Sequence, residues 1–76
     1  GIYLAPESRD TFTVTVPGNY FSGQVSADAA GIIATLFALN QLCNKSPNLT
    51  LYDKYYLLLD FANEHKEAQA IFAAID

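Results

Sequence analysis

The sequence predicts a small α+β domain in which an N-terminal antiparallel β-hairpin packs against three helices. Strict alternation of apolar and polar residues over 11–16 is typical of a half-buried strand. Three later segments repeat their apolar residues at helical spacing, and polar, proline-containing breaks separate the strands from the helices. The chain of 76 residues has room for one domain, spanning 1–76. Because a two-stranded hairpin is marginal in water, we expect it to belong to a larger α+β fold.

The two predicted strands lie within the first sixteen residues. Ile2–Leu4 is a short apolar run that Pro6 ends, and residues 7–10 have the composition of a turn. Residues 11–16 then place three apolar side chains on one face and three threonines on the other. A polar connection of this length between two such runs indicates a hairpin.

The first helix is predicted to follow a loop over residues 20–25, which contains Gly23. Ser26 is a favourable N-cap, and Asp28 lies in the first turn, where the helix dipole favours a negative charge. The apolar pattern extends this helix over about 27–43.

This helix has no charged residue between positions 29 and 42, and a helix that is apolar nearly all round is typical of a buried helix, although 76 residues are hardly enough protein to surround it. Gly31 costs about 1 kcal/mol relative to alanine in a helix interior. We therefore expect Gly31 to permit the close approach of another element.

Two further helices are predicted, over about 51–63 and over 67–75. Thr50 followed by Asp53 approximates a capping box at the start of the second helix. Apolar residues at helical spacing continue to Ile75. The core stripe of the second helix is predicted to consist of Leu51, Tyr55, Leu58 and Ala62.

The composition excludes several classes of function. The net charge is −4, which disfavours binding to nucleic acid, because such binding needs a basic surface. A mimic of DNA would need about fifteen acidic positions over a domain of this size, and the chain has eight. Charged residues make up only 16%, which predicts an apolar surface that contacts a partner. No segment is long and apolar enough to predict a membrane span. The single cysteine predicts a reducing, cytoplasmic compartment.

Few residues could carry chemistry, and we expect neither a catalytic residue nor a cofactor. Cys43 and His65 are the only thiol–imidazole pair, with Asp60 to orient the imidazole in a cysteine-dependent hydrolase. The preferred interpretation is that Cys43 packs in the core and that His65 is a solvated or helix-terminal residue. His65 with Glu64 or Glu67 offers at most two ligands, so no metal site is expected.

Three tyrosines at one helix start are the candidate interaction surface: Tyr52, Tyr55 and Tyr56. A tyrosine can bury its ring and leave its hydroxyl in water, which suits an interface. Packing at the rim of the core is the alternative explanation, and the sequence leaves both open.

Four stretches in order carry a resemblance to a known family. They are Gly1–Pro6, the helix start Ser26–Ile32, the tyrosine-rich stretch that ends at His65, and the ending Ala70–Asp76. Together they resemble the C-terminal half of the plasmid-borne antirestriction proteins of the KlcA/ArdB type. Phe61 departs from the pattern, because the family usually has tyrosine there.

This resemblance implies a bacterial cytoplasmic protein that counteracts host type I restriction–modification systems without enzymatic activity, by protein–protein interaction. Members of the family are about twice as long. The resemblance therefore implies a missing N-terminal half. The apolar composition predicts that this chain is stable only by association, with that half or as a homo-oligomer, through the sheet edge or the helix over 27–43. The alternative is a small structural or oligomerisation module with no role in restriction.

Overall fold

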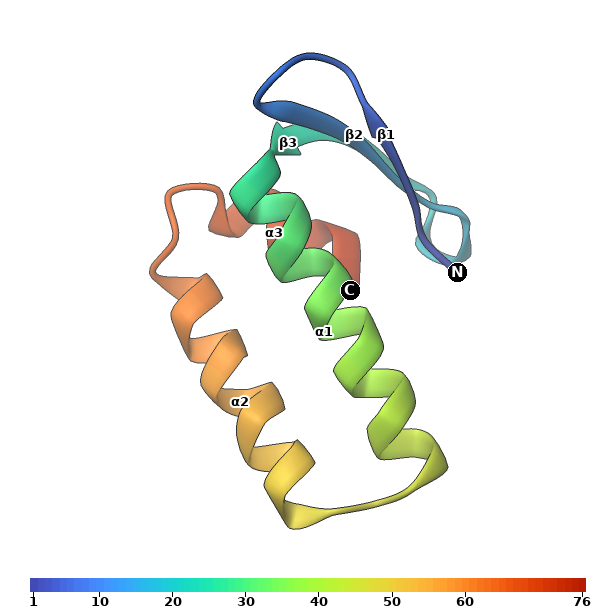
Figure 1. Cartoon of the computed structure of the whole chain (residues 1–76), viewed down its shortest axis with the longest axis vertical. Helices are drawn as coiled ribbons and strands as arrows, with labels where there is room; N and C mark the ends of the chain where they lie inside the picture. The colour runs from blue at the N-terminus through green and yellow to red at the C-terminus, as the bar shows by residue number, and fades with distance from the viewer.

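A three-stranded antiparallel sheet followed by three helices makes up the computed structural model, which describes residues 1–76 (Figure 1). This confirms the predicted α+β class. The strands follow one another in the sheet in the order β1-β2-β3. The elements are β1 (Tyr3–Pro6), β2 (Thr11–Val16), β3 (Phe21–Ser26), α1 (Ala27–Lys45), α2 (Leu49–Asn63) and α3 (Ala68–Ile75), with a short 3₁₀ turn at Pro17–Asn19.

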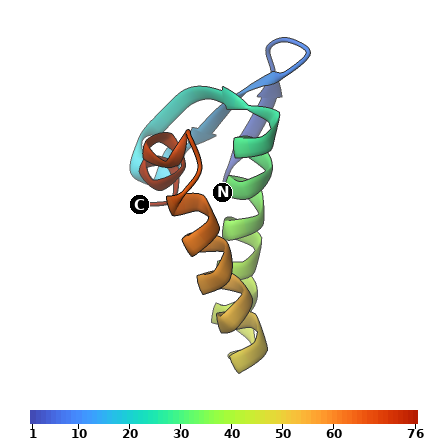
Figure 2. The same ribbon diagram turned by 90° about the vertical axis from the view of Figure 1, so that its left-hand side faces the viewer.

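The molecule is elongated because α1 and α2 form an antiparallel hairpin that projects from the sheet. Figure 2 shows the sheet and α3 gathered at one end, with the helical hairpin extending away from them. The principal extents are 37 × 25 × 19 Å, and the radius of gyration is 12.3 Å. A domain of this length has a radius of gyration of about 11.4 Å on average, so the hairpin leaves part of the chain less enclosed than usual.

The sheet has one strand more than the sequence predicts, because the segment predicted as a loop is β3. Gly23 pairs with the buried Val14 and occupies an inward-facing position of the strand. The ring of Phe21 covers this position: a Cβ on Gly23 would lie 3.1 Å from Phe21 Cζ. A neighbouring ring therefore fills the space of the side chain that glycine lacks.

The core lies where β2, β3, α1 and α3 meet. The largest side chains that are completely enclosed are Val14, Ile33, Leu36 and Ile71. From α2 only Ala62 is fully buried, while its other predicted core residues are partly buried. Helix α2 is therefore an outer element of the fold.

Helix α1 is buried along one face only, so the 76 residues do not surround it. Its buried residues are Ala29, Ala30, Ile32, Ile33, Leu36 and Cys43. Gly31 lies on the opposite face, and a Cβ built on it would meet nothing within 4 Å. No element approaches Gly31, contrary to the sequence-based expectation.

Replacing Gly31 with alanine is expected to raise the free energy of unfolding by about 1 kcal/mol, because alanine is the better helix former and the added methyl group has open space. Denaturant unfolding followed by circular dichroism measures this change. An unchanged or lowered midpoint would contradict it.

The helix boundaries differ from the predicted ones by one or two residues. Helix α2 begins at Leu49 because Asn48 is its N-cap: Asn48 Oδ1 accepts hydrogen bonds from the backbone N–H groups of Thr50 (2.8 Å) and Leu51 (3.3 Å). The predicted capping box of Thr50 and Asp53 is therefore wrong. Helix α1 continues to Lys45 instead of ending at Cys43. None of the helices combines the length and hydropathy that crossing a bilayer requires.

The end of α3 is attached to the turn between β2 and β3. The side-chain amide of Asn19 donates to the carbonyl oxygens of Ala74 (2.7 Å) and Asp76 (3.1 Å). These groups occupy positions that would otherwise be unpaired at a helix C-terminus. The contact holds α3 against the sheet, which positions the neighbouring surface of α2.

Candidate functional site

The three predicted surface tyrosines lie on α2, and the structure separates them. Tyr56 is 61% exposed and Tyr52 is 37% exposed, whereas Tyr55 is half-buried and packs against the core. The rings of Tyr55 and Tyr56 meet edge-to-face, with centroids 5.5 Å apart and an interplanar angle of 78°. Two of the tyrosines are therefore free to contact a partner, and the third supports one of them.

Two carboxylates accompany the exposed tyrosines on the solvent side of α2. Asp53 precedes Tyr56 by three residues, and Asp60 follows it by four, so the three lie on one helix face. Both aspartates are exposed. We call Tyr52, Asp53, Tyr56 and Asp60 the outer stripe of α2.

An open apolar hollow of about 560 Å³ lies beside this stripe, between α2 and α3. Leu59 forms its α2 side, three residues after Tyr56, and Phe72 and Ile75 contribute apolar side chains from α3. Gln69, Ala73 and Asp76 complete the lining. The hollow therefore begins about one helical turn from Tyr56 of the outer stripe.

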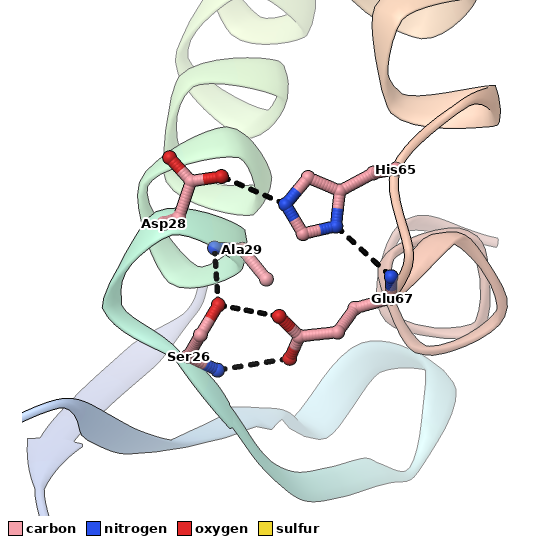
Figure 3. Close-up of polar contacts among 5 residues, drawn as sticks. All are labelled: Ser26, Asp28, Ala29, His65 and Glu67. Carbon is pink, nitrogen blue, oxygen red and sulfur yellow. Dashed lines mark hydrogen bonds and ion pairs between the residues drawn. The ribbon is translucent and has the colours of Figure 1, made fainter.

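A cluster of polar side chains joins the start of α1 to the turn between α2 and α3 (Figure 3). The Glu67 carboxylate accepts hydrogen bonds from the backbone N–H of Ser26 (2.9 Å) and from the Ser26 hydroxyl. Ser26 Oγ in turn accepts from the backbone N–H of Ala29 (3.1 Å), which confirms the predicted N-cap. We call the set Ser26, Asp28, His65 and Glu67 the clasp.

His65 supplies the second half of the clasp. Its Nδ1 accepts a hydrogen bond from the backbone N–H of Glu67 (2.9 Å), so the ring proton is on Nε2, which donates to Asp28 Oδ2 at 2.7 Å. The His65 side chain is only 10% exposed. The interpretation of His65 as a solvated residue is therefore wrong, because the ring fills the gap between α1 and the turn, whereas its interpretation as a helix-terminal residue is confirmed, because His65 directly follows Glu64, the C-cap of α2.

The hydrogen bonds of the clasp perturb one acid. The pKa of Glu67 lies below its ordinary value of 4.5, chiefly because the Ser26 hydroxyl donates to the carboxylate and then because the Ser26 backbone N–H does so. Partial burial opposes this effect, while His65 and Lys66 add to it. The clasp is therefore built for the ionised form of Glu67.

Comparison with known proteins places the chain in a family. The family model described as "Antirestriction protein" matches residues 1–76. The chain belongs to the antirestriction protein family. It is 52% identical to an Escherichia coli antirestriction protein KlcA, with all of the chain aligned to 55% of that relative. It is 36% identical to the putative antirestriction protein YubI of E. coli K12, again over the whole chain and 58% of the relative.

A second KlcA of E. coli is 49% identical, with all of the chain aligned to 56% of its length. This antirestriction chain therefore spans about half the length of the curated relatives it matches. The resemblance seen in four separate stretches of the sequence is confirmed by a match that runs through all of them.

In this antirestriction chain the two residues of the hypothetical cysteine hydrolase are far apart. Cys43 is buried near the end of α1, whereas His65 contacts Asp28 in the first turn of the same helix. Fifteen residues of α-helix separate Asp28 from Cys43, which is about 22 Å. The carboxylate beside His65 is that of Asp28 and not that of Asp60, so the three residues cannot act as a nucleophile, base and orienting acid.

Two of the candidate metal ligands, His65 and Glu67, are likewise engaged in other contacts. Both ring nitrogens of His65 take part in hydrogen bonds, and the Glu67 carboxylate is bound by Ser26. No group of three or more metal-ligating side chains occurs in the chain.

The sequence does not predict the clasp. It indicates Ser26 and Asp28 only as residues of a helix start, and His65 and Glu67 only as possible metal ligands. Ser26 and Glu67 are 41 positions apart, and no local pattern reports a contact over that separation. The only signal is that two of the stretches that carry the family resemblance, one starting at Ser26 and one ending at His65, meet here. The contact between Asp28 and His65 joins those two stretches, and Glu67, two residues further on, adds a contact to Ser26.

Glu67 is expected to make the fold sensitive to acid. Its pKa is lower in the folded than in the unfolded chain, so its contribution to stability is present above pH of about 4.5 and is lost as the pH falls through the lower folded value. Glu67→Gln is expected to flatten this part of the curve of unfolding free energy against pH. Denaturant unfolding at a series of pH values measures it, and Glu64→Gln is the control. Equal slopes for the wild type and Glu67→Gln would contradict the expectation.

Proposed function

We propose that this chain is part of an antirestriction protein that counteracts host type I restriction–modification systems, acts without enzymatic chemistry and works by contact with a protein partner. The match of the antirestriction family model over residues 1–76 carries this proposal. The identity of 52% to a KlcA protein supports it.

The charge and the geometry of the chain favour an antirestriction mechanism by contact with a protein over DNA mimicry, DNA binding or catalysis. Eight acidic residues against four basic ones are too few to imitate the phosphates of DNA and too many for a surface that binds DNA. Cys43 and His65 are the only thiol–imidazole pair of the chain, and their separation argues against a cysteine-dependent hydrolase. Exposed aromatic residues on α2 are the residue type that protein interfaces favour.

The proposed setting is the bacterial cytoplasm, and the proposed partner is a type I restriction–modification complex. The chain also associates, in this proposal, with a second copy or with the remaining half of a protein the length of its relatives. Its accessible surface is 5104 Å², against about 4,600 Å² for a monomeric protein of this mass. This excess also favours the alternative function, a structural or oligomerisation module.

A plating assay tests the proposal. The complete gene that encodes this chain is expressed in a host with a type I system, and unmodified phage is plated on that host. We expect the efficiency of plating to rise towards that of modified phage, with no change in a host that lacks the system. Unchanged restriction at normal protein levels, together with a large symmetric interface in the purified protein, would favour the oligomerisation module instead.

A further inference from the structure

We propose that the outer stripe of α2 is the docking surface for a partner segment that presents arginine side chains. This inference rests on the proposed function, because it names the chemistry of the protein partner. The stripe contains two exposed tyrosine rings and two exposed carboxylates, and it has no cationic side chain.

The nearest basic residue of the helix cannot neutralise the stripe. Lys54 is two residues before Tyr56, which places it about 160° around the helix from that ring. Asp53 and Asp60 also have no partner among the ion pairs of the fold, of which the contact between His65 and Asp28 is the only one. The two carboxylates are therefore available to a cation from outside.

The tyrosines make arginine the best match among cations. A guanidinium group stacks on an aromatic face and binds carboxylates through its planar fork, whereas the lysine ammonium is a compact and strongly hydrated charge. Tyr56 has carboxylates one turn before it and one turn after it on the same face. Its contact with the half-buried Tyr55 restrains the ring before any partner arrives.

Other occupants fit the stripe less well. An apolar partner surface would bury Asp53 and Asp60 without a counter-charge, which is unfavourable. A second copy of the chain, docked through the same stripe, would bring together four carboxylates and no cation, so it faces the same cost with added repulsion. Nucleic acid would be repelled.

The hollow beside the stripe has the character needed for the rest of the partner segment. Leu59, Phe72 and Ile75 offer an apolar wall, and Leu59 lies about one helical turn from Tyr56. A segment with arginines on one side and apolar side chains on the other would pair its charges with the stripe and bury its apolar side in the hollow. Apolar contact of this kind supplies affinity, and the arginine contacts supply orientation.

Titration with designed peptides tests the inference on the chain itself. The probes are an alanine-based helical peptide with arginines one turn apart and leucines beside them, and a twin with lysines in place of the arginines. Amide chemical shifts of the ¹⁵N-labelled chain report binding. We expect saturable shifts confined to α2 and α3, with the arginine peptide bound about threefold or more tightly than its twin.

Two variants of the outer stripe and one control variant test which side chains bind the arginine peptide. D53N/D60N is expected to weaken binding of the arginine peptide by about tenfold or more. E7Q/D10N removes the same amount of charge from the distant turn between β1 and β2, and its binding is expected to stay within about twofold of wild type. Tyr56→Ala, at an exposed position, removes the ring without touching the core and is also expected to weaken binding.

The outcomes separate this inference from the proposed function. Absence of saturable shifts, equal binding of the lysine twin, or unchanged binding by both D53N/D60N and Tyr56→Ala would overturn the arginine site. In the plating assay, protection by D53N/D60N equal to that of wild type would also overturn the site and leave the antirestriction function standing. Failure of the wild-type gene to protect would overturn the function whatever the peptides do.

Discussion

Ile71→Ala is expected to lower the free energy of unfolding by about 3 kcal/mol. Ile71 is completely enclosed and is the largest buried residue of α3, a helix of eight residues. So short a helix is not stable alone, so α3 depends on its packing against the sheet and α1. Loss of the side chain removes buried apolar surface and leaves a cavity that the small core can fill only in part.

Denaturant unfolding followed by circular dichroism measures this loss. Leu57→Ala is the matched control, because Leu57 is 68% exposed on α2 and its truncation is expected to change stability by no more than about 0.5 kcal/mol. Similar losses for the two variants would show that α3 does not contribute to the core in the way its burial indicates.

Ser26→Ala is expected to cost about 2 kcal/mol, which is large for a serine substitution. The hydroxyl caps α1 by accepting from the Ala29 N–H and also donates to the ionised Glu67. Removing it loses both bonds and leaves one side of a partly buried carboxylate unpaired. Most single surface substitutions change stability by less than about 0.5 kcal/mol.

A double-mutant cycle of Ser26→Ala with Glu67→Ala separates the two roles of the hydroxyl. A coupling energy near zero would assign the whole effect to the cap and would contradict the clasp. Ser22→Ala is the control, because Ser22 is an exposed residue of β3 without a side-chain hydrogen bond. Ser26→Thr keeps the hydroxyl and is expected to recover most of the stability.

The strands show what the sequence could and could not predict. Residues 11–16 alternate strictly, and β2 has those bounds. Strand β3 alternates as well, but Gly23 occupies one of its inward positions and Ser22 and Gln24 flank it, so its composition is that of a loop. The apolar group at that position is the ring of Phe21, which comes from a neighbouring residue and which the pattern of the sequence does not reveal.

The sequence predicts the ends of the helices to within two residues, but it does not predict which groups surround each side chain. Periodicity placed Leu58 and Ala62 on the inner face of α2, and they are partly and fully buried there. It could not decide between surface and core for the tyrosines, because Tyr52 and Tyr56 border the buried face. The contact between Glu67 and Ser26 depends on tertiary packing, so only the folded chain reveals it.

The clasp has a mechanical consequence for the helical hairpin. It pins the base of α1 to the turn after α2, while the far tip of the hairpin, where the connection between α1 and α2 lies, projects away from the sheet (Figure 1). Helix α1 is about 28 Å long, and its part beyond Leu36, the last α1 residue in the buried core cluster, forms the projecting arm. A ligand bound near the tip of α2 would therefore exert a turning moment on the hairpin, which the hydrogen bonds of Glu67 and His65 at its base would resist.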